Sequence, residues 1–152
     1  SWPAGVADVS APYAGKCACG AVSVAVSAEP VTTRQCWCRQ CQQLASGGPT
    51  HNAIFPTDAV AITGERAENS YVAASGNVLT HEFCAHCGTP VLGRSSARPQ
   101  FRTLRFGLLD EGHGLRPQAA IWTDDAPEWA MIDPALEQFA QQPPAPAIPA
   151  ED

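Results

Sequence analysis

Hydrophobic and polar residues alternate over short distances along most of this chain, and a two-residue period is typical of strands buried on one face. The clearest case is Val22, Val24 and Val26, which alternate with serine and alanine and predict a half-buried strand. Similar short runs predict further strands over residues 53–56, 59–63, 70–73, 78–83, 101–109 and 118–122. The pattern therefore predicts a mainly β domain with little helix.

Turn residues separate these runs. Residues 63–65 and 75–77 have the composition of tight turns, and the second turn is expected to close a hairpin. A short helical turn is predicted over residues 42–48, where the glycines end it. A second short helix is predicted from Asp133 as its cap, with Pro134 at its first position and Leu136 and Phe139 on one face.

Three segments follow from this pattern. Residues 1–14 carry little periodicity and are expected to form an N-terminal arm. Residues 15–141 form the predicted domain, and the proline-rich tail, 142–152, is expected to be disordered. A length of 152 residues suits one domain of this kind, with a core small enough to gain from a structural metal.

The charge and composition of the chain argue against some classes of function. The net charge is −6 and the isoelectric point is about 5.1, which argues against a nucleic-acid partner. No apolar run reaches membrane-spanning length, and the first residues lack the layout of a signal peptide. We therefore expect a cytoplasmic protein without a membrane partner, and the oligomeric state stays open.

The seven cysteines fall into short clusters, which is typical of metal ligands in a reducing compartment. Cys17 and Cys19 stand in CAC, and neighbours two apart in a strand face the same side. Cys84 and Cys87 stand in CAHCG, where Gly88 can adopt the left-handed conformation that such a turn needs. Together the four thiolates complete a tetrahedral shell, so we predict a closed, structural zinc site.

The remaining cysteines, Cys36, Cys38 and Cys41, stand in CWCRQC. We expect Cys36 and Cys38 to share a strand face and Cys41 to turn back toward them. Three thiolates leave the fourth zinc position open, as in catalytic sites, and zinc there would hold an incoming thiol as its thiolate. A redox dithiol with a spare cysteine, or a second closed site completed by a histidine, are the alternatives.

Other residues near these clusters suggest a pocket. His51 is the best candidate for a fourth ligand or a general acid/base. His81, His86 and His113 are expected to be ordinary hydrogen-bonded or solvated imidazoles, with His86 pointing away from the metal.

An arginine run can anchor an anionic peptide-like substrate, although a solvated surface is the commoner use of such residues. It comprises Arg94, Arg98, Arg102 and Arg105. Trp37 and Phe55 can wall a pocket or pack in the core.

Five motifs resemble the glutathione-dependent formaldehyde-activating enzyme family, which also includes centromere protein V and has the Mss4-like fold. They are GKCACGAV (15–22), CWCRQCQQ (36–43), ITGE (62–65), HEFCAHCGTPV (81–91) and IWTDDAPEW (121–129). The resemblance runs from about Gly15 to Gln141. It implies a small fold of twisted antiparallel sheets built around a structural zinc.

The resemblance also implies site residues and an activity. Its structural zinc falls on Cys17, Cys19, Cys84 and Cys87, and its second, catalytic zinc on Cys36, Cys38 and Cys41. The implied activity joins glutathione to formaldehyde, giving S-hydroxymethylglutathione, and is classed as a carbon–sulfur lyase. The chain departs from the family pattern at Trp37, commonly histidine, and at Gln42, commonly arginine.

Three functions are thus to be distinguished. The leading hypothesis is an enzyme that handles a small thiol or thiol–aldehyde adduct at an exchangeable zinc held by three cysteines. A zinc-stabilised binding module would instead expose an apolar patch to a protein partner. A thiol sensor would exchange the zinc at Cys36, Cys38 and Cys41 for a disulfide.

Overall fold

The computed structural model describes residues 10–147, which form eleven strands and one short α-helix. The strands are β1 (Tyr13–Lys16), β2 (Ser23–Val26), β3 (Thr32–Cys36), β4 (Thr50–Pro56), β5 (Val60–Thr63), β6 (Arg66–Val72), β7 (Val78–Cys84), β8 (Pro90–Ser95), β9 (Phe101–Arg105), β10 (Ala119–Ile121) and β11 (Glu137–Gln138). The helix is α1 (Arg39–Leu44), and three 3-10 turns are η1 (Thr57–Ala59), η2 (Phe106–Leu108) and η3 (Thr123–Asp125). The predicted mainly β class is confirmed. No helix within residues 10–147 is long and apolar enough to cross a membrane.

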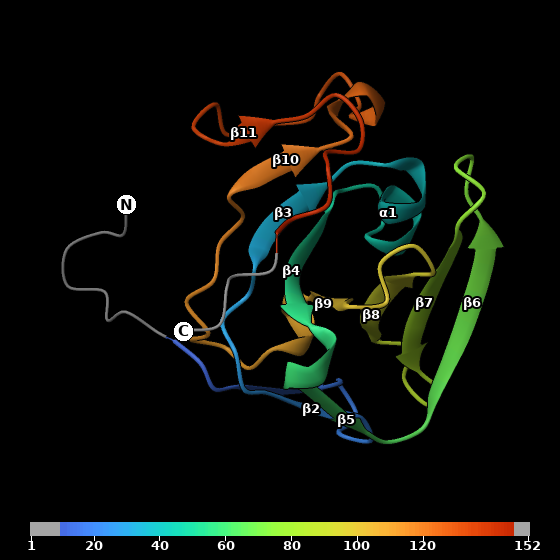
Figure 1. Ribbon diagram of the computed structural model, residues 1–152, viewed down its shortest axis with the longest axis vertical. Helices are drawn as coiled ribbons and strands as arrows, with labels where there is room; N and C mark the ends of the chain where they lie inside the picture. The colour runs from blue at the N-terminus through green and yellow to red at the C-terminus, as the bar shows by residue number, and fades with distance from the viewer. Residues whose placement is uncertain (1–9, 148–152) are drawn as a thin grey trace.

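Two sheets organise the chain. The smaller sheet has the order β1-β2-β5 and is antiparallel throughout. The larger sheet has the order β11-β10-β3-β4-β9-β8-β7-β6. In Figure 1 the larger sheet curves, so that α1 lies between β4 on one side and β7 on the other. This curvature brings the end of β3 and the middle of β7 to the same region of the molecule.

The C-terminal part differs from the prediction. The helix predicted from Asp133 is wrong, because residues 133–136 form a turn, in which the amide of Leu136 donates to the carbonyl of Asp133 over 3.1 Å. Strand β11 follows and pairs in parallel with β10, which itself pairs in parallel with β3. This pairing satisfies the backbone groups of β10, since Phe139 N donates to Ala120 O over 2.9 Å. The larger sheet is therefore mixed rather than purely antiparallel.

Several element boundaries also differ. Strand β1 begins at Tyr13, within the predicted arm, and β8 was not predicted from the sequence. The strand predicted over 101–109 ends at Arg105, where the 3-10 turn η2 follows. The helical turn predicted over 42–48 begins earlier, at Arg39.

The start of the predicted tail packs against the domain. Pro143 is buried, and the indole nitrogen of Trp122 donates to Gln142 Oε1 over 3.0 Å. The rest of the predicted arm and tail, residues 1–9 and 148–152, lies outside the described residues.

The core consists of two clusters, and each contains cysteines of one group. The larger cluster packs both sheets together and includes Cys17 and Cys84. Its fully buried side chains include Phe55 and Leu104. The smaller cluster contains Cys36, Cys41 and Ile121, with Cys38, Trp122 and Phe139 packed against it. Each group thus has cysteines packed in the core, whereas Cys19 and Cys87 are exposed.

Candidate metal centres and the adjoining pocket

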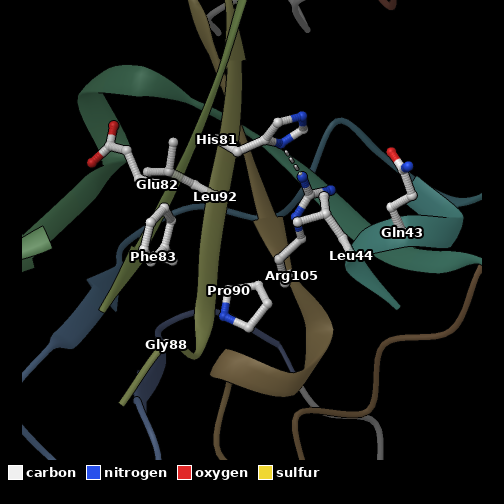
Figure 2. Close-up of a pocket in the computed structure, with 9 residues that line it drawn as sticks. All are labelled: Gln43, Leu44, His81, Glu82, Phe83, Gly88, Pro90, Leu92 and Arg105. Carbon is white, nitrogen blue, oxygen red and sulfur yellow. Dashed lines mark hydrogen bonds between the residues drawn. The ribbon is translucent and has the colours of Figure 1, made fainter. Parts of the chain in front are cut away.

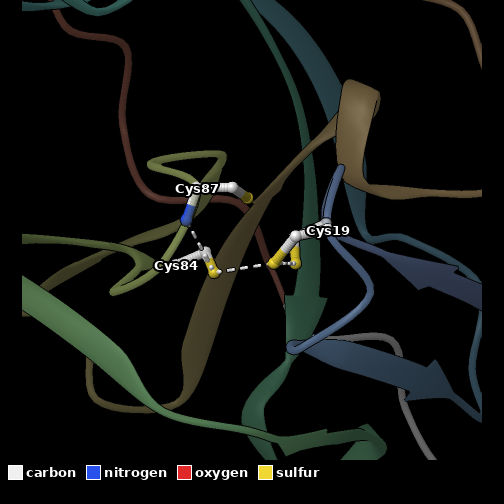
Figure 3. Close-up of side chains that lie close together, drawn as sticks. Cys19, Cys84 and Cys87 are labelled. Atoms are coloured by element: carbon white, nitrogen blue, oxygen red, sulfur yellow. Dashed lines mark hydrogen bonds between the residues drawn. The ribbon is translucent and has the colours of Figure 1, made fainter.

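The first cysteine group joins the start of the chain to the end of β7. The sulfur atoms of Cys17, Cys19, Cys84 and Cys87 all lie within 4.8 Å of one another. The Cys17 and Cys19 sulfurs are 3.6 Å apart. The Cys19 and Cys84 sulfurs, which Figure 3 shows, are 3.8 Å apart. A tetrahedral zinc ion with bonds of about 2.3 Å requires sulfur–sulfur separations of about 3.8 Å. The four sulfurs therefore fit such an ion.

Turns rather than a strand bring these sulfurs together. Cys17 follows the end of β1, and a turn is closed by the amide of Gly20 donating to Cys17 O over 3.0 Å. The predicted shared strand face of Cys17 and Cys19 is therefore wrong. The prediction for the second pair is confirmed, because Gly88 has φ of 78° and its amide donates to Cys84 O over 2.9 Å.

Backbone amides point at the sulfurs of this group. Val22 N lies 3.2 Å from Cys17 Sγ, and the amides of His86 and Cys87 lie 3.4 Å from Cys84 Sγ. The Thr89 hydroxyl lies 3.1 Å from Cys87 Sγ, and hydrogen bonds from Thr89 lower the pKa of Cys87 to about 5. Such donors favour thiolates, the form in which cysteine binds a metal.

The second cysteine group lies where β3 runs into α1. Cys36 is the last residue of β3, Cys38 caps α1, and Cys41 lies inside the helix. Their three sulfurs lie within 4.8 Å of one another, and Cys41 N donates to Cys38 Sγ over 3.4 Å. The predicted shared strand face of Cys36 and Cys38 is wrong, since Cys38 lies beyond the strand. The capping geometry turns its sulfur toward the other two instead.

His51 does not join this group. In the β3–β4 pair Thr50 is opposite Cys36, whereas His51 is opposite Gln35. Because successive residues of a strand face opposite sides, His51 lies on the other side of the sheet from Cys36. Its Nε2 is 3.1 Å from the side-chain amide of Gln35. The position of His51 therefore gives no support to its predicted role as ligand or acid/base.

Arg105, which the sequence indicated only as part of an arginine run, lies close to this group. It ends β9 and is only 8% exposed. Its guanidinium donates to Asn52 Oδ1 over 2.6 Å and to His81 Nδ1 over 3.0 Å. Neither partner carries a negative charge, and no carboxylate within residues 10–147 forms an ion pair with Arg105. Its charge acts instead on the three thiols at Cys36, Cys38 and Cys41.

The electrostatics favour ionised sulfur at Cys41, whereas hydrogen bonds with Cys38 and Cys41 raise the pKa of Cys36. The hydrogen bond with Cys36 lowers the pKa of Cys38, but Cys41 and burial outweigh it and raise that pKa to about 11. Hydrogen bonds from Cys36 and Cys38 lower the pKa of Cys41 well below the usual thiol value, although burial opposes the shift. The charge of Arg105 and the Thr50 side chain lower it further. A buried, unpaired guanidinium is costly. A zinc ion with three thiolates carries one net negative charge, which would balance it, so the donor set fits this metal.

A cavity of about 200 Å³ lies between α1 and the strands β7 to β9 (Figure 2), and Arg105 is among its lining residues. Its lining includes Leu44 from the helix and His81, Leu92 and Arg105 from the strands. Tyr71 stacks on His81, with ring centroids 5.7 Å apart. Burial raises the pKa of Tyr71 to about 12, and the charges of the three cysteines contribute. Tyr71, His81 and Arg105 thus lie near the cysteines.

The other residues considered from the sequence have structural roles. Arg94 pairs with Glu82 and Glu68, so the predicted arginine run does not converge on one site. Trp37 and Phe55 are buried in the protein. Gln42 is also buried, and its amide nitrogen donates to Trp37 O and Asp125 O over 2.8 and 2.9 Å.

Comparison with known families identifies the chain. The model of the glutathione-dependent formaldehyde-activating enzyme family matches residues 12–125. The chain belongs to this family. A search among curated proteins finds no match. A crystal structure of a Rhodobacter sphaeroides protein superposes with a TM-score of 0.50 and 22% identity, covering 68% of this chain and 91% of that one. This likeness supports the fold of the family member described here.

Proposed function

We propose that this protein is a zinc-dependent enzyme that joins a small thiol to an aldehyde, with glutathione and formaldehyde as the first pair to test. The observation that carries the proposal is the convergence of Cys36, Cys38 and Cys41 beside the buried, otherwise uncompensated charge of Arg105. The family match over residues 12–125 supplies the reaction type.

The two cysteine groups take different roles in this proposal. Cys17, Cys19, Cys84 and Cys87 would hold a zinc with a complete ligand shell, which stabilises the fold. Cys36, Cys38 and Cys41 would hold a second zinc with room for one more ligand. When bound there, zinc lowers the pKa of an incoming thiol and keeps it as a thiolate.

The bond changes balance without a redox partner. The thiolate sulfur forms a bond to the carbonyl carbon, and the electron pair of the carbonyl π bond moves to oxygen. That oxygen takes a proton from water, so the thiol proton released earlier is recovered in the product. The reverse direction breaks the same carbon–sulfur bond, which is why the activity is classed as a lyase.

The cavity next to Arg105 suits a small adduct. Apolar side chains such as Phe83, Pro90 and Leu92 line it, and its polar lining residues are Gln43, His81, Glu82 and Arg105. Pockets of this kind commonly combine apolar walls with a few placed polar groups that fix orientation.

The binding-module alternative has less support. The exposed large apolar side chains of the described residues are Val72 and Val78, which face each other at a hairpin, and Trp129 and Met131 in a loop. These two small groups lie on different segments and do not form the broad patch that the alternative requires.

The proposal is tested by mixing zinc-loaded protein with glutathione and isotope-labelled formaldehyde and following the formation of S-hydroxymethylglutathione by NMR. We expect the wild-type protein to accelerate exchange between free and bound formaldehyde, and Cys38→Ser to lose this acceleration. No acceleration by the wild-type protein would overturn the proposed activity.

A further inference from the structure

The hydrogen bond between Arg105 and His81 fixes the protonation pattern of the imidazole. A guanidinium has only donors, so His81 Nδ1 must accept the bond from Arg105 Nη2 over 3.0 Å (Figure 2). Burial and the charge of Arg105 also lower the pKa of His81 and favour the neutral ring. A neutral imidazole that accepts at Nδ1 carries its proton on Nε2.

This Nε2–H group has no partner. His81 Nε2 is buried and makes no hydrogen bond within the part of the chain that the structure describes. Leaving a buried donor unsatisfied is destabilising, so native proteins rarely do it without a purpose. The ring is held firmly, because Tyr71 stacks on it at 5.7 Å. The donor is thus fixed in position before any ligand arrives.

His81 lies across a cavity from the helix that carries Cys41. Gln43 and Leu44 of α1, which follow Cys41, line this cavity together with His81. In Figure 2 one imidazole nitrogen faces Arg105 and the other lies on the far side of the ring. His81 and Arg105 both line the cavity described above.

Gly93 provides the space that this pair needs. It lies opposite His81 in the β7–β8 pair. A Cβ at this position would lie 3.1 Å from Arg105 Nη2 and 3.7 Å from His81 Nδ1. The first distance is tighter than ordinary van der Waals contact. A side chain here would therefore disturb the hydrogen bond that orients the imidazole.

We infer that His81 is a catalytic residue whose Nε2–H donates a hydrogen bond to the substrate oxygen that becomes negative as the carbon–sulfur bond forms. The inference rests on the proposed function, because that reaction moves an electron pair onto this oxygen. His81 keeps its own proton in this role, and water supplies the proton of the product. Arg105 is a positioning residue that holds the tautomer.

Two amide variants of His81 test the roles of the two ring nitrogens one at a time. His81→Asn keeps a group near Nδ1 for Arg105 but removes the donor at Nε2. His81→Gln keeps an amide donor near Nε2. We expect His81→Asn to lower kcat about 100- to 1,000-fold, the usual cost of losing one such donor, with a small change in KM for glutathione. His81→Gln should retain activity within about tenfold of wild type, and the loop variant His113→Gln serves as the control.

A spectroscopic measurement complements the kinetics. In zinc-loaded protein with nitrogen-labelled histidine, NMR should show the proton of His81 on Nε2. Adding glutathione with formaldehyde should shift this resonance, whereas S-methylglutathione, which lacks the oxygen, should not. Equal shifts with both additions, or a proton on Nδ1, would overturn the inference.

The outcomes distinguish this inference from the proposed function. If the wild type is active and His81→Asn is as active as His113→Gln, only the inference fails. If both His81 variants lose activity equally along with bound zinc, His81 is structural and the inference also fails. If the wild-type protein does not react glutathione with formaldehyde, the proposed function fails and the inference fails with it.

Discussion

The sulfur of Cys19 lies 3.8 Å from the sulfur of Cys84, although 65 residues separate them in the chain. This contact ties the turn after β1 to the end of β7, and Cys84 is itself only 1% exposed. A metal shared by these residues would therefore link the small sheet to the large one. The second group spans only the junction of β3 and α1. The two groups should differ in what they contribute to stability.

We predict that Cys84→Ser is far more destabilising than Cys38→Ser. Structural zinc sites contribute roughly 10–16 kcal/mol of apparent binding free energy to folding, and Cys84 also fills the core. We expect Cys84→Ser to lower the unfolding midpoint by about 10 °C or more, and Cys38→Ser by less than about 4 °C. Thermal unfolding of both variants in excess zinc measures the difference. An equal decrease of the unfolding midpoint in both variants would contradict the assignment of a structural role to the first group and a catalytic role to the second.

Gly93→Ala should impair the site more than the fold. The added methyl group would press on Arg105 Nη2, so we expect kcat to fall about tenfold or more, with a stability loss of about 1–2 kcal/mol. Gly107→Ala is the matched control, because a Cβ at Gly107 meets nothing within 4 Å. Steady-state kinetics of both variants test this, and an unimpaired Gly93→Ala would argue against the Arg105–His81 arrangement.

Gln42 should be sensitive to a change of one atom. Its amide nitrogen donates to the carbonyls of Trp37 and Asp125, so Gln42→Glu would place a carboxylate oxygen against two carbonyl oxygens. We expect a loss of about 2–3 kcal/mol. The neighbouring Gln43 is exposed, and Gln43→Glu should change stability by less than about 0.5 kcal/mol. Urea unfolding of the two variants compares them, and equal effects would mean that these hydrogen bonds contribute little.

The environment of Glu82 leads us to predict that the stability of the protein depends on pH. Burial raises its pKa, but hydrogen bonds from Arg66 and Arg94 outweigh this and lower it below the usual value. A lowered pKa in the folded state means that the stabilisation is present above the unfolded pKa of about 4.3 and is lost as the pH falls through the folded pKa. We expect the free energy of unfolding of the wild type to exceed that of Glu82→Gln by about 1–2 kcal/mol at pH 7. This difference should become smaller below about pH 4.

Measuring the unfolding of both proteins across this pH range cancels effects that they share, such as loss of zinc. Glu68→Gln is the control, because the Glu68 side chain is 57% exposed. A gap between wild type and Glu82→Gln that stays constant with pH would contradict the assigned shift.

The sequence allowed the seven cysteines to be divided into four and three because ligand spacing is local. How the sulfurs of each group come together was not predictable in the same way. Simple alternation assigned them to strands, whereas turns and a helix cap position them in the structure. His51 illustrates the limit, because its face depends on the β3–β4 register, which places Thr50 rather than His51 opposite Cys36.

The residues around the second group were harder to anticipate. Tyr71, His81 and Arg105 come from β6, β7 and β9, which approach α1 only through the curvature of the large sheet. The C-terminal segment shows the same limit, since a local helix signal at Asp133 was overridden by parallel pairing of β11 with β10. In both cases long-range strand pairing decided the outcome.

The central claim is that Cys36, Cys38 and Cys41 form an open zinc site that receives a thiol. Native mass spectrometry of zinc-loaded protein, with and without glutathione, tests it most directly. We predict two zinc ions per chain and a glutathione adduct in wild type, and one zinc ion without the adduct in Cys38→Ser. A single zinc ion in wild type, with no adduct and a disulfide among these three cysteines, would contradict the claim.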